Sequence, residues 1–118
     1  MNSKQKEIKE LLSTFLEGMR NLSSEDQQVY RPFQDLINAI NNPGELEEKA
    51  KVLISIGIAT YSRNEQSLVY HINEAYKLGA TQEEIAEAAM VSVISGGMDS
   101  MTFFVTYVKD AIEALQTK

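Results

Sequence analysis

The chain has 118 residues, the length of one ordinary domain, and 43% of them are hydrophobic and 24% charged, which is typical of a globular protein rather than a disordered one. Asp and Glu total 17 against 11 Lys and Arg, and the net charge of −6 repels phosphate backbones, so we expect no nucleic-acid partner. The absence of cysteine and the single histidine exclude disulfides and almost every nitrogen- and sulfur-ligated metal site, so we expect neither a metal nor a cofactor.

The first residues, MNSKQKEIKELL, are charged and helical in pattern. They do not form the basic segment and apolar run of a secretory signal, and no later apolar run is long enough to cross a membrane. The sequence therefore predicts one domain over residues 1–118, located in the cytoplasm and without a membrane partner.

The N-terminal segment predicts an amphipathic helix that Ser3 caps. Asn21 to Ser24 interrupt its pattern. Its apolar residues recur at the spacing of one buried helical face: Ile8, Leu11, Leu12, Phe15, Leu16 and Met19.

A second helix is predicted from Pro32 to Asn41, because proline favours the first position of a helix. Ser24 and Gln27 form a capping box for the turn that precedes it. The residues expected in its buried face are Phe33, Leu36, Ile37 and Ile40.

Residues 45–61 predict a third helix that is apolar around most of its circumference. Its β-branched residues would also suit a strand. The acidic first turn, the length of about four turns and the helical neighbours favour a helix. We expect it to be the most buried element, with Gly57 allowing a close neighbour.

Two further capping boxes, Ser62–Glu65 and Thr81–Glu84, predict the next helix starts. The first of these helices ends at Gly79 and the second at residues 95–97, and a last helix runs from about residue 99 to 115. The fold class is therefore all-α, with five or six helices. The last helix has an apolar stripe broad enough to meet another subunit: Phe103, Phe104, Val105, Tyr107 and Val108.

Residues 50–97 resemble the carboxymuconolactone decarboxylase and alkyl hydroperoxidase D-like superfamily. The resemblance rests on an apolar helix at 50–60, a helix at 64–78 that contains His71, the junction LGATQEEIAEA, and an Ala-rich helix that ends in glycines. It implies a five- to six-helix bundle of the alkyl hydroperoxidase D-like type. It also implies self-assembly into a homotrimer or homohexamer.

Redox members of this superfamily use a Cys-x-x-Cys-x-x-x-His motif and a glutamate on the preceding apolar helix. When this motif is aligned so that its histidine matches His71, the two cysteines correspond to Asn64 and Ser67. The glutamate then corresponds to Val52. Asn64 and Ser67 can neither form a thiolate nor resolve a disulfide, and Val52 cannot relay a proton. The lactone decarboxylase branch also lacks the cysteine pair and keeps the histidine, but it carries charged residues at the other two positions.

His71 and Ser67 are the candidate catalytic residues, because side chains four residues apart share one helical face. His71 would act as a general acid or base, with Ser67 as a substrate ligand or weakly activated hydroxyl. The structural alternative is that His71 donates a hydrogen bond to a backbone carbonyl within a packed interface.

Asn64, Arg63 and Tyr70 are the candidate substrate-binding residues. Asn64 and Arg63 lie at a helix junction, where backbone N–H groups and the helix dipole favour an anion. The alternatives are that Asn64 only caps the helix and that Tyr70 only packs.

Three functions remain open from the sequence. The first is binding of a small, anionic organic molecule near His71 with non-redox proton transfer, such as lactone isomerisation coupled to decarboxylation. The second is a non-catalytic oligomeric binding or scaffold protein. The third is the hydroperoxide-reducing antioxidant role that family membership alone would suggest.

Overall fold

Helices make up almost all of the protein in the computed structural model, which describes residues 1–116. No strand occurs among the residues so described, and the prediction of an all-α bundle is confirmed. In chain order the elements are α1 (Ser3–Arg20), α2 (Ser24–Asn41), α3 (Glu48–Ser62), α4 (Glu65–Lys77), α5 (Gln82–Phe103), the π-helical turn η1 (Phe104–Val108) and α6 (Lys109–Ala114).

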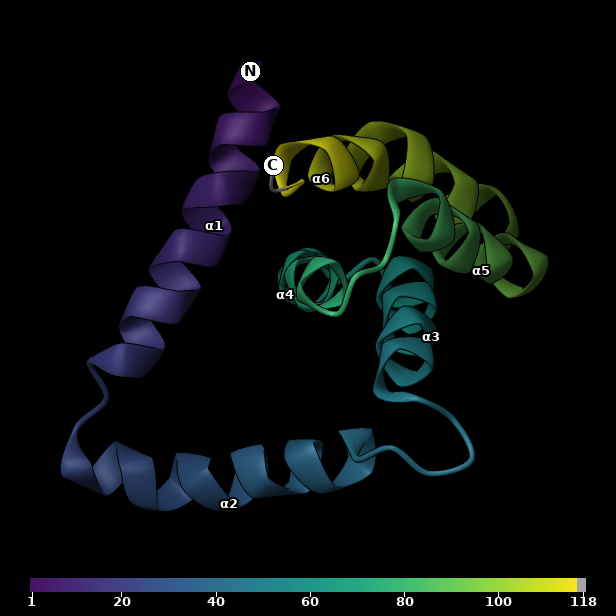
Figure 1. The fold of residues 1–118 in the computed structure, drawn as a ribbon. Coiled ribbons are helices and arrows are strands. Elements are labelled where there is room, and N and C mark those ends of the chain that lie inside the picture. The colour runs from purple at the N-terminus through teal and green to yellow at the C-terminus, as the bar shows by residue number, and fades with distance from the viewer. Residues whose placement is uncertain (117–118) are drawn as a thin grey trace.

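The core lies where α3 packs against α4 and α5, with α1 and α6 closing its side next to α4. Figure 1 shows α4 at the centre of the molecule, with α1 and α3 on either side of it and α2 crossing beyond them. The side chains that are almost completely buried come from α1, α3, α4, α5 and η1: Ile8, Val52, Ile56, Leu68, Val69, Ile72, Ile85 and Val108.

The α2 helix differs from its prediction in both its start and its burial. Ser23 is the N-cap, its hydroxyl accepting the Asp26 N–H at 3.1 Å, and Pro32 lies inside the helix. No residue of α2, all of which the structure describes, is buried. The expectation that the apolar residues of this helix lie in the core is therefore wrong, because periodicity identifies an apolar face but not what covers it.

The arm formed by α2 is joined to the body at both ends. At its N-terminal end it follows α1 after a short turn. At its C-terminal end, the Lys51 ammonium on α3 donates hydrogen bonds to the carbonyls of Ile40 at 2.9 Å and Asn42 at 2.7 Å. A cation at this position suits the negative end of the helix dipole.

The N-cap of α4 lies two residues after the predicted cap, Ser62. Arg63 adopts a left-handed conformation with φ of 53°, which ends α3, and Asn64 becomes the N-cap of α4. Ser62 instead donates its hydroxyl back to the Ile58 carbonyl at 2.9 Å. The first helix shows a similar displacement, since Asn2 rather than Ser3 is its N-cap.

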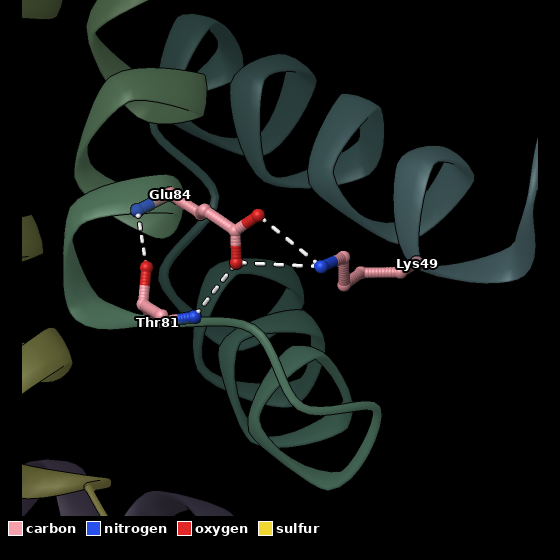
Figure 2. Close-up of polar contacts among 3 residues, drawn as sticks. All are labelled: Lys49, Thr81 and Glu84. Carbon is pink, nitrogen blue, oxygen red and sulfur yellow. Dashed lines mark hydrogen bonds and ion pairs between the residues drawn. The ribbon is translucent and has the colours of Figure 1, made fainter.

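The predicted capping box at the start of α5 is confirmed, and it also joins α5 to α3. Thr81 accepts the Glu84 N–H at 3.0 Å, and the Glu84 carboxylate accepts the Thr81 N–H at 2.9 Å. The Lys49 ammonium of α3 lies 3.2 Å from the same carboxylate (Figure 2). These contacts lower the pKa of Glu84, the hydrogen bond from the Thr81 backbone contributing most and Lys49 next.

The predicted break after α5 is present only as a kink. Gly97, with φ of 57°, leaves the helical conformation, and the helix then resumes through η1 and α6. Within the apolar stripe of the last helix, Phe103, Phe104 and Val108 are buried inside the chain, whereas Val105 is 54% exposed, and contact of one side of the stripe with another subunit stays a prediction. Residues 82–114 match a membrane span in length and hydropathy alone, a weak indication that core helices also give.

Exposed apolar side chains lie on α3 and α5 as well as on α2. The expectation that α3 is apolar because it is buried on most sides is wrong for Ile54 and Ile58, which are more than half exposed. Gly57 does allow a close neighbour, because a Cβ there would lie 3.0 Å from the Ala88 carbonyl oxygen.

Candidate functional site

A large hollow separates α4 from α2, with α1 and α3 completing its walls. Its volume is about 1120 Å³. The apolar side chains on its walls come mainly from α1 and α2. The lining residues that carry side-chain polar groups are Asp26, Tyr30, Gln34, Asn41, Ser55, Asn64, Gln66, Ser67, Tyr70 and His71.

His71 is held on the α4 wall of this hollow by its own helix. Its Nδ1 lies 2.8 Å from the Ser67 carbonyl oxygen and 3.2 Å from the Ser67 hydroxyl. A carbonyl oxygen can only accept, so Nδ1 must carry the hydrogen. In the neutral imidazole, Nε2 is therefore the nitrogen with the free lone pair.

The aromatic ring of Tyr70 fixes the other side of the imidazole. The two ring centroids are 5.2 Å apart at 87°, and Tyr70 in turn packs edge-on against Phe15 of α1 at 5.7 Å. Burial, together with the charges of Glu74 and Tyr30, raises the pKa of Tyr70. Its phenol therefore stays protonated at neutral pH and can donate a hydrogen bond.

Asn64 and Ser67 occupy the N-cap and third positions of α4. The Asn64 side-chain oxygen accepts the Ser67 N–H at 3.0 Å, which is ordinary capping, and both residues also line the hollow. The two positions that the resemblance registers on a cysteine pair are thus hydrogen-bonded neighbours beside His71. Val52, registered on the glutamate, is instead buried in the core.

Arg63 is not brought to the hollow, although it directly precedes Asn64. Its guanidinium lies 3.4 Å from the Asp99 carboxylate on α5, in an exposed ion pair. Its left-handed backbone turns it away from the wall that Asn64 lines. Of the four site residues predicted besides His71, the structure therefore brings Ser67, Asn64 and Tyr70 to this wall.

Sequence reasoning missed the polar residues that face α4 from α2 and α3. Tyr30 and Gln34 lie on the α2 wall, where the Tyr30 hydroxyl donates to the Gln34 side-chain oxygen. Ser55 lies on the α3 wall. The spacing of Tyr30 and Gln34 indicated one shared helical face, but only the placement of α2 opposite α4 relates that face to His71.

The walls of the hollow carry little charge. Asp26 is the one charged residue on the lining that the structure describes, and the rest of the lining is apolar or neutral and polar. Residues 1–116 also contain no group of three or more His, Cys, Asp or Glu residues that could hold a metal ion. The walls are therefore suited to a mostly apolar molecule with one polar end.

Comparison with known proteins decides the family. The profile of the carboxymuconolactone decarboxylase family matches residues 27–110, which is most of the chain. The chain belongs to this family. The predicted superfamily is thereby confirmed, and the matched region contains most of α2 and the whole of α4, which carries His71.

Two sequence relatives of this carboxymuconolactone decarboxylase family member have no assigned function. An uncharacterized protein of Methanocaldococcus jannaschii is 30% identical over 89 residues, covering 75% of this chain and 86% of the relative. An uncharacterized protein of Cupriavidus necator is 28% identical over 65 residues, covering 55% of this chain and 58% of its own length.

Two solved structures of carboxymuconolactone decarboxylase family proteins share the fold. The protein from Legionella pneumophila, in its apo form, superposes with a TM-score of 0.79 at 25% identity, over 92% of this chain and 94% of its own. The protein from Thermotoga maritima, for which a part in the antioxidative response has been suggested, gives a TM-score of 0.63 at 24% identity, over 92% and 86%.

Proposed function

We propose that this protein binds a small organic acid in the hollow beside His71 and transfers protons on it without redox chemistry. The observation that carries the proposal is the 2.8 Å contact between His71 Nδ1 and the Ser67 carbonyl. It leaves Nε2 as the nitrogen that can accept a proton at a wall of the hollow. An imidazole can act as either a general base or a general acid, so one side chain can both take up and return the proton.

The chemistry of the walls supports an acid whose body is mostly apolar. Phe15, Phe33 and Ile37 offer apolar surface, while the first turn of α4 supplies backbone N–H groups at the positive end of its dipole. A carboxylate would lie near Asn64 and the N–H groups that follow it. The described lining contains no cationic side chain, so the acid is held by hydrogen bonds rather than by an ion pair.

The reaction class that fits is isomerisation or decarboxylation of an unsaturated lactone acid. In isomerisation, His71 Nε2 removes a proton from one carbon and returns it to another. In decarboxylation, the bond to the carboxylate breaks and CO₂ leaves, and the electron pair passes into the conjugated lactone carbonyl. The resulting carbanion takes a proton from the His71 imidazolium, which recovers one from solvent.

Ligand binding is tested by NMR, because His71 is the only histidine and its imidazole signals need no assignment. Small aromatic and aliphatic carboxylic acids are titrated alongside their primary amides. We expect at least one acid to shift the His71 signals saturably and its amide to bind more weakly. Acids that bind while leaving the His71 signals in place would contradict the proposal.

Thiol peroxidase activity is expected to be absent, because the chain contains no cysteine that could form the sulfenic acid or the disulfide. Purified protein is assayed with cumene hydroperoxide and dithiothreitol against a buffer blank. Peroxide consumption above the blank would contradict this expectation and would support a hydroperoxide-reducing antioxidant function.

A second candidate, a non-catalytic binding protein, is favoured by the size of the hollow. Its volume of about 1120 Å³ lies above the usual range of small-molecule sites, roughly 300–1,000 Å³. Incorporation of solvent deuterium into a bound lactone acid separates the two candidates. Exchange that is no faster than with the His71→Gln variant would favour the binding role.

A further inference from the structure

The α2 wall of the hollow carries a row of polar side chains for which the proposed proton transfer has no use. This row, here called the α2 column, consists of Asp26, Tyr30, Gln34 and Asn38, at the four-residue spacing of one helical face. The first three of these residues line the hollow, and Tyr30 and Gln34 are partly buried. Figure 1 shows α2 lying across from α4, so the column is on the wall opposite His71.

The hydrogen bonds within the α2 column all run in one direction. The Tyr30 hydroxyl donates to the Gln34 side-chain oxygen, and the Gln34 side-chain nitrogen donates to the Asn38 side-chain oxygen at 3.1 Å. A phenol has one hydrogen to donate, so the Tyr30 oxygen can offer only its lone pairs to a ligand. The carboxylate of Asp26 is likewise an acceptor only. The Asp26 end of the column therefore offers acceptors and no side-chain donor.

The α4 wall has the opposite polarity. The Asn64 side-chain oxygen already accepts the Ser67 N–H, which leaves its side-chain NH₂ group to donate. The Tyr70 phenol is held in its protonated form, and Tyr30 is one of the groups that raise its pKa, so the two phenols lie within electrostatic range of each other. In the proposed reaction His71 Nε2 is reserved for the proton. A bound molecule therefore meets chiefly donors on α4 and acceptors on α2.

Charge decides which polar group suits the α2 wall. The described lining contains no cationic side chain, and no ion pair within residues 1–116 includes Asp26. A carboxylate placed at this wall would meet the negative charge of Asp26 without compensation, and such like-charge contacts select against a ligand. A hydroxyl group would instead donate a charge-assisted hydrogen bond to the same carboxylate.

We propose that the hollow selects an acid with one carboxylate, bound at the α4 wall, and a hydroxyl group at its far end, which donates to Asp26 and Tyr30. The apolar body of the acid lies between the two walls, beside Phe33. Dicarboxylic acids are rejected. This inference rests on the proposed function, because it names the class of acid that the same hollow takes. Asp26 and Tyr30 set specificity and have no part in proton transfer.

Three acids that share one body test the selection directly. Phenylpropanoic acid, its para-hydroxy derivative and its para-carboxy derivative are titrated into wild-type protein, and binding is followed through the His71 imidazole signals. We expect the hydroxy acid to bind about tenfold more tightly than the parent acid, the value of one hydrogen bond to a charged group. The dicarboxylic acid should bind most weakly. Added salt should reduce its disadvantage, because salt screens its repulsion from Asp26.

Two variants separate charge from hydrogen bonding. Asp26→Asn should improve binding of the dicarboxylic acid severalfold and reduce the advantage of the hydroxy acid. Tyr30→Phe should reduce the advantage of the hydroxy acid without improving binding of the dicarboxylic acid. In the matched control, Asp35→Asn makes the same charge change at an exposed position on the opposite side of α2, and the ratios of the three affinities should stay as in the wild type.

Two results would overturn this inference and leave the proposed function standing. One is a dicarboxylic acid that binds wild type as tightly as the hydroxy acid does. The other is an equal change in selectivity in Asp26→Asn and Asp35→Asn. If none of the three acids shifts the His71 signals, both proposals fail. The comparison in wild-type protein does not depend on the folding of any variant.

Discussion

The pair formed by Ser67 and His71 is the part of the site that residue spacing predicts well. Four residues apart on a helix, the two side chains were expected within hydrogen-bonding reach, and their atoms lie 3.2 Å apart. The backbone-carbonyl alternative is realised in the same contact, through the Ser67 carbonyl. Arg63 could not be placed in this way, because its direction depends on a left-handed residue at a helix end.

The geometry assigns Ser67 a positioning role rather than a nucleophilic one. Nδ1 of His71 donates, so it cannot remove the proton from the Ser67 hydroxyl. The Ser67→Ala variant keeps the carbonyl, so binding of an acid ligand should weaken by no more than about fivefold, the value of one ordinary hydrogen bond. A loss as large as that of His71→Gln in the same titration would identify the hydroxyl as essential.

Helix boundaries were predicted to within a few residues where one cap residue stands alone. The Thr81–Glu84 box was placed correctly, whereas Ser3 and Ser24 each adjoin another residue that can cap, and Ser62 lies two residues before one. Local chemistry alone does not choose between such neighbours. The second helix was predicted too short, because Pro32 was placed at its first position. In the structure Pro32 lies inside α2.

The Glu84 carboxylate should make the junction of α3 and α5 sensitive to acid. Its pKa lies below the ordinary value of 4.5, so its stabilising effect is present above that value and is lost as the pH falls through the lowered pKa. Urea unfolding of Glu84→Gln and wild type should therefore differ most at neutral pH and converge in acid. A difference that stays constant across this range would contradict the assignment.

At the scale of the whole molecule, the sequence predicts which residues are apolar but not where α2 lies. The apolar residues of α2 and those of α4 recur at similar spacing, yet Val29, Phe33, Leu36 and Ile40 are exposed while the apolar face of α4 lies in the core. Only tertiary placement distinguishes them. The hollow escaped prediction for the same reason, because its two polar walls come from elements far apart in sequence.

The position of the core is tested by shortening the side chain of Ile56, which is completely buried on α3. Ile56→Val should lower the free energy of unfolding by about 0.5–1.5 kcal/mol, and Ile56→Ala by about 2–5 kcal/mol. Denaturant unfolding measures both. Equal and small effects would mean that α3 is not the centre of the packing.

The most direct test of the account is the tautomer of His71, since proton transfer through Nε2 depends on it. Nitrogen-15 NMR of the imidazole, above the pH at which the ring loses its charge, distinguishes the two nitrogens. The account predicts that Nδ1 carries the hydrogen and that Nε2 shows the shift of an unprotonated nitrogen. A neutral ring protonated on Nε2 would contradict it.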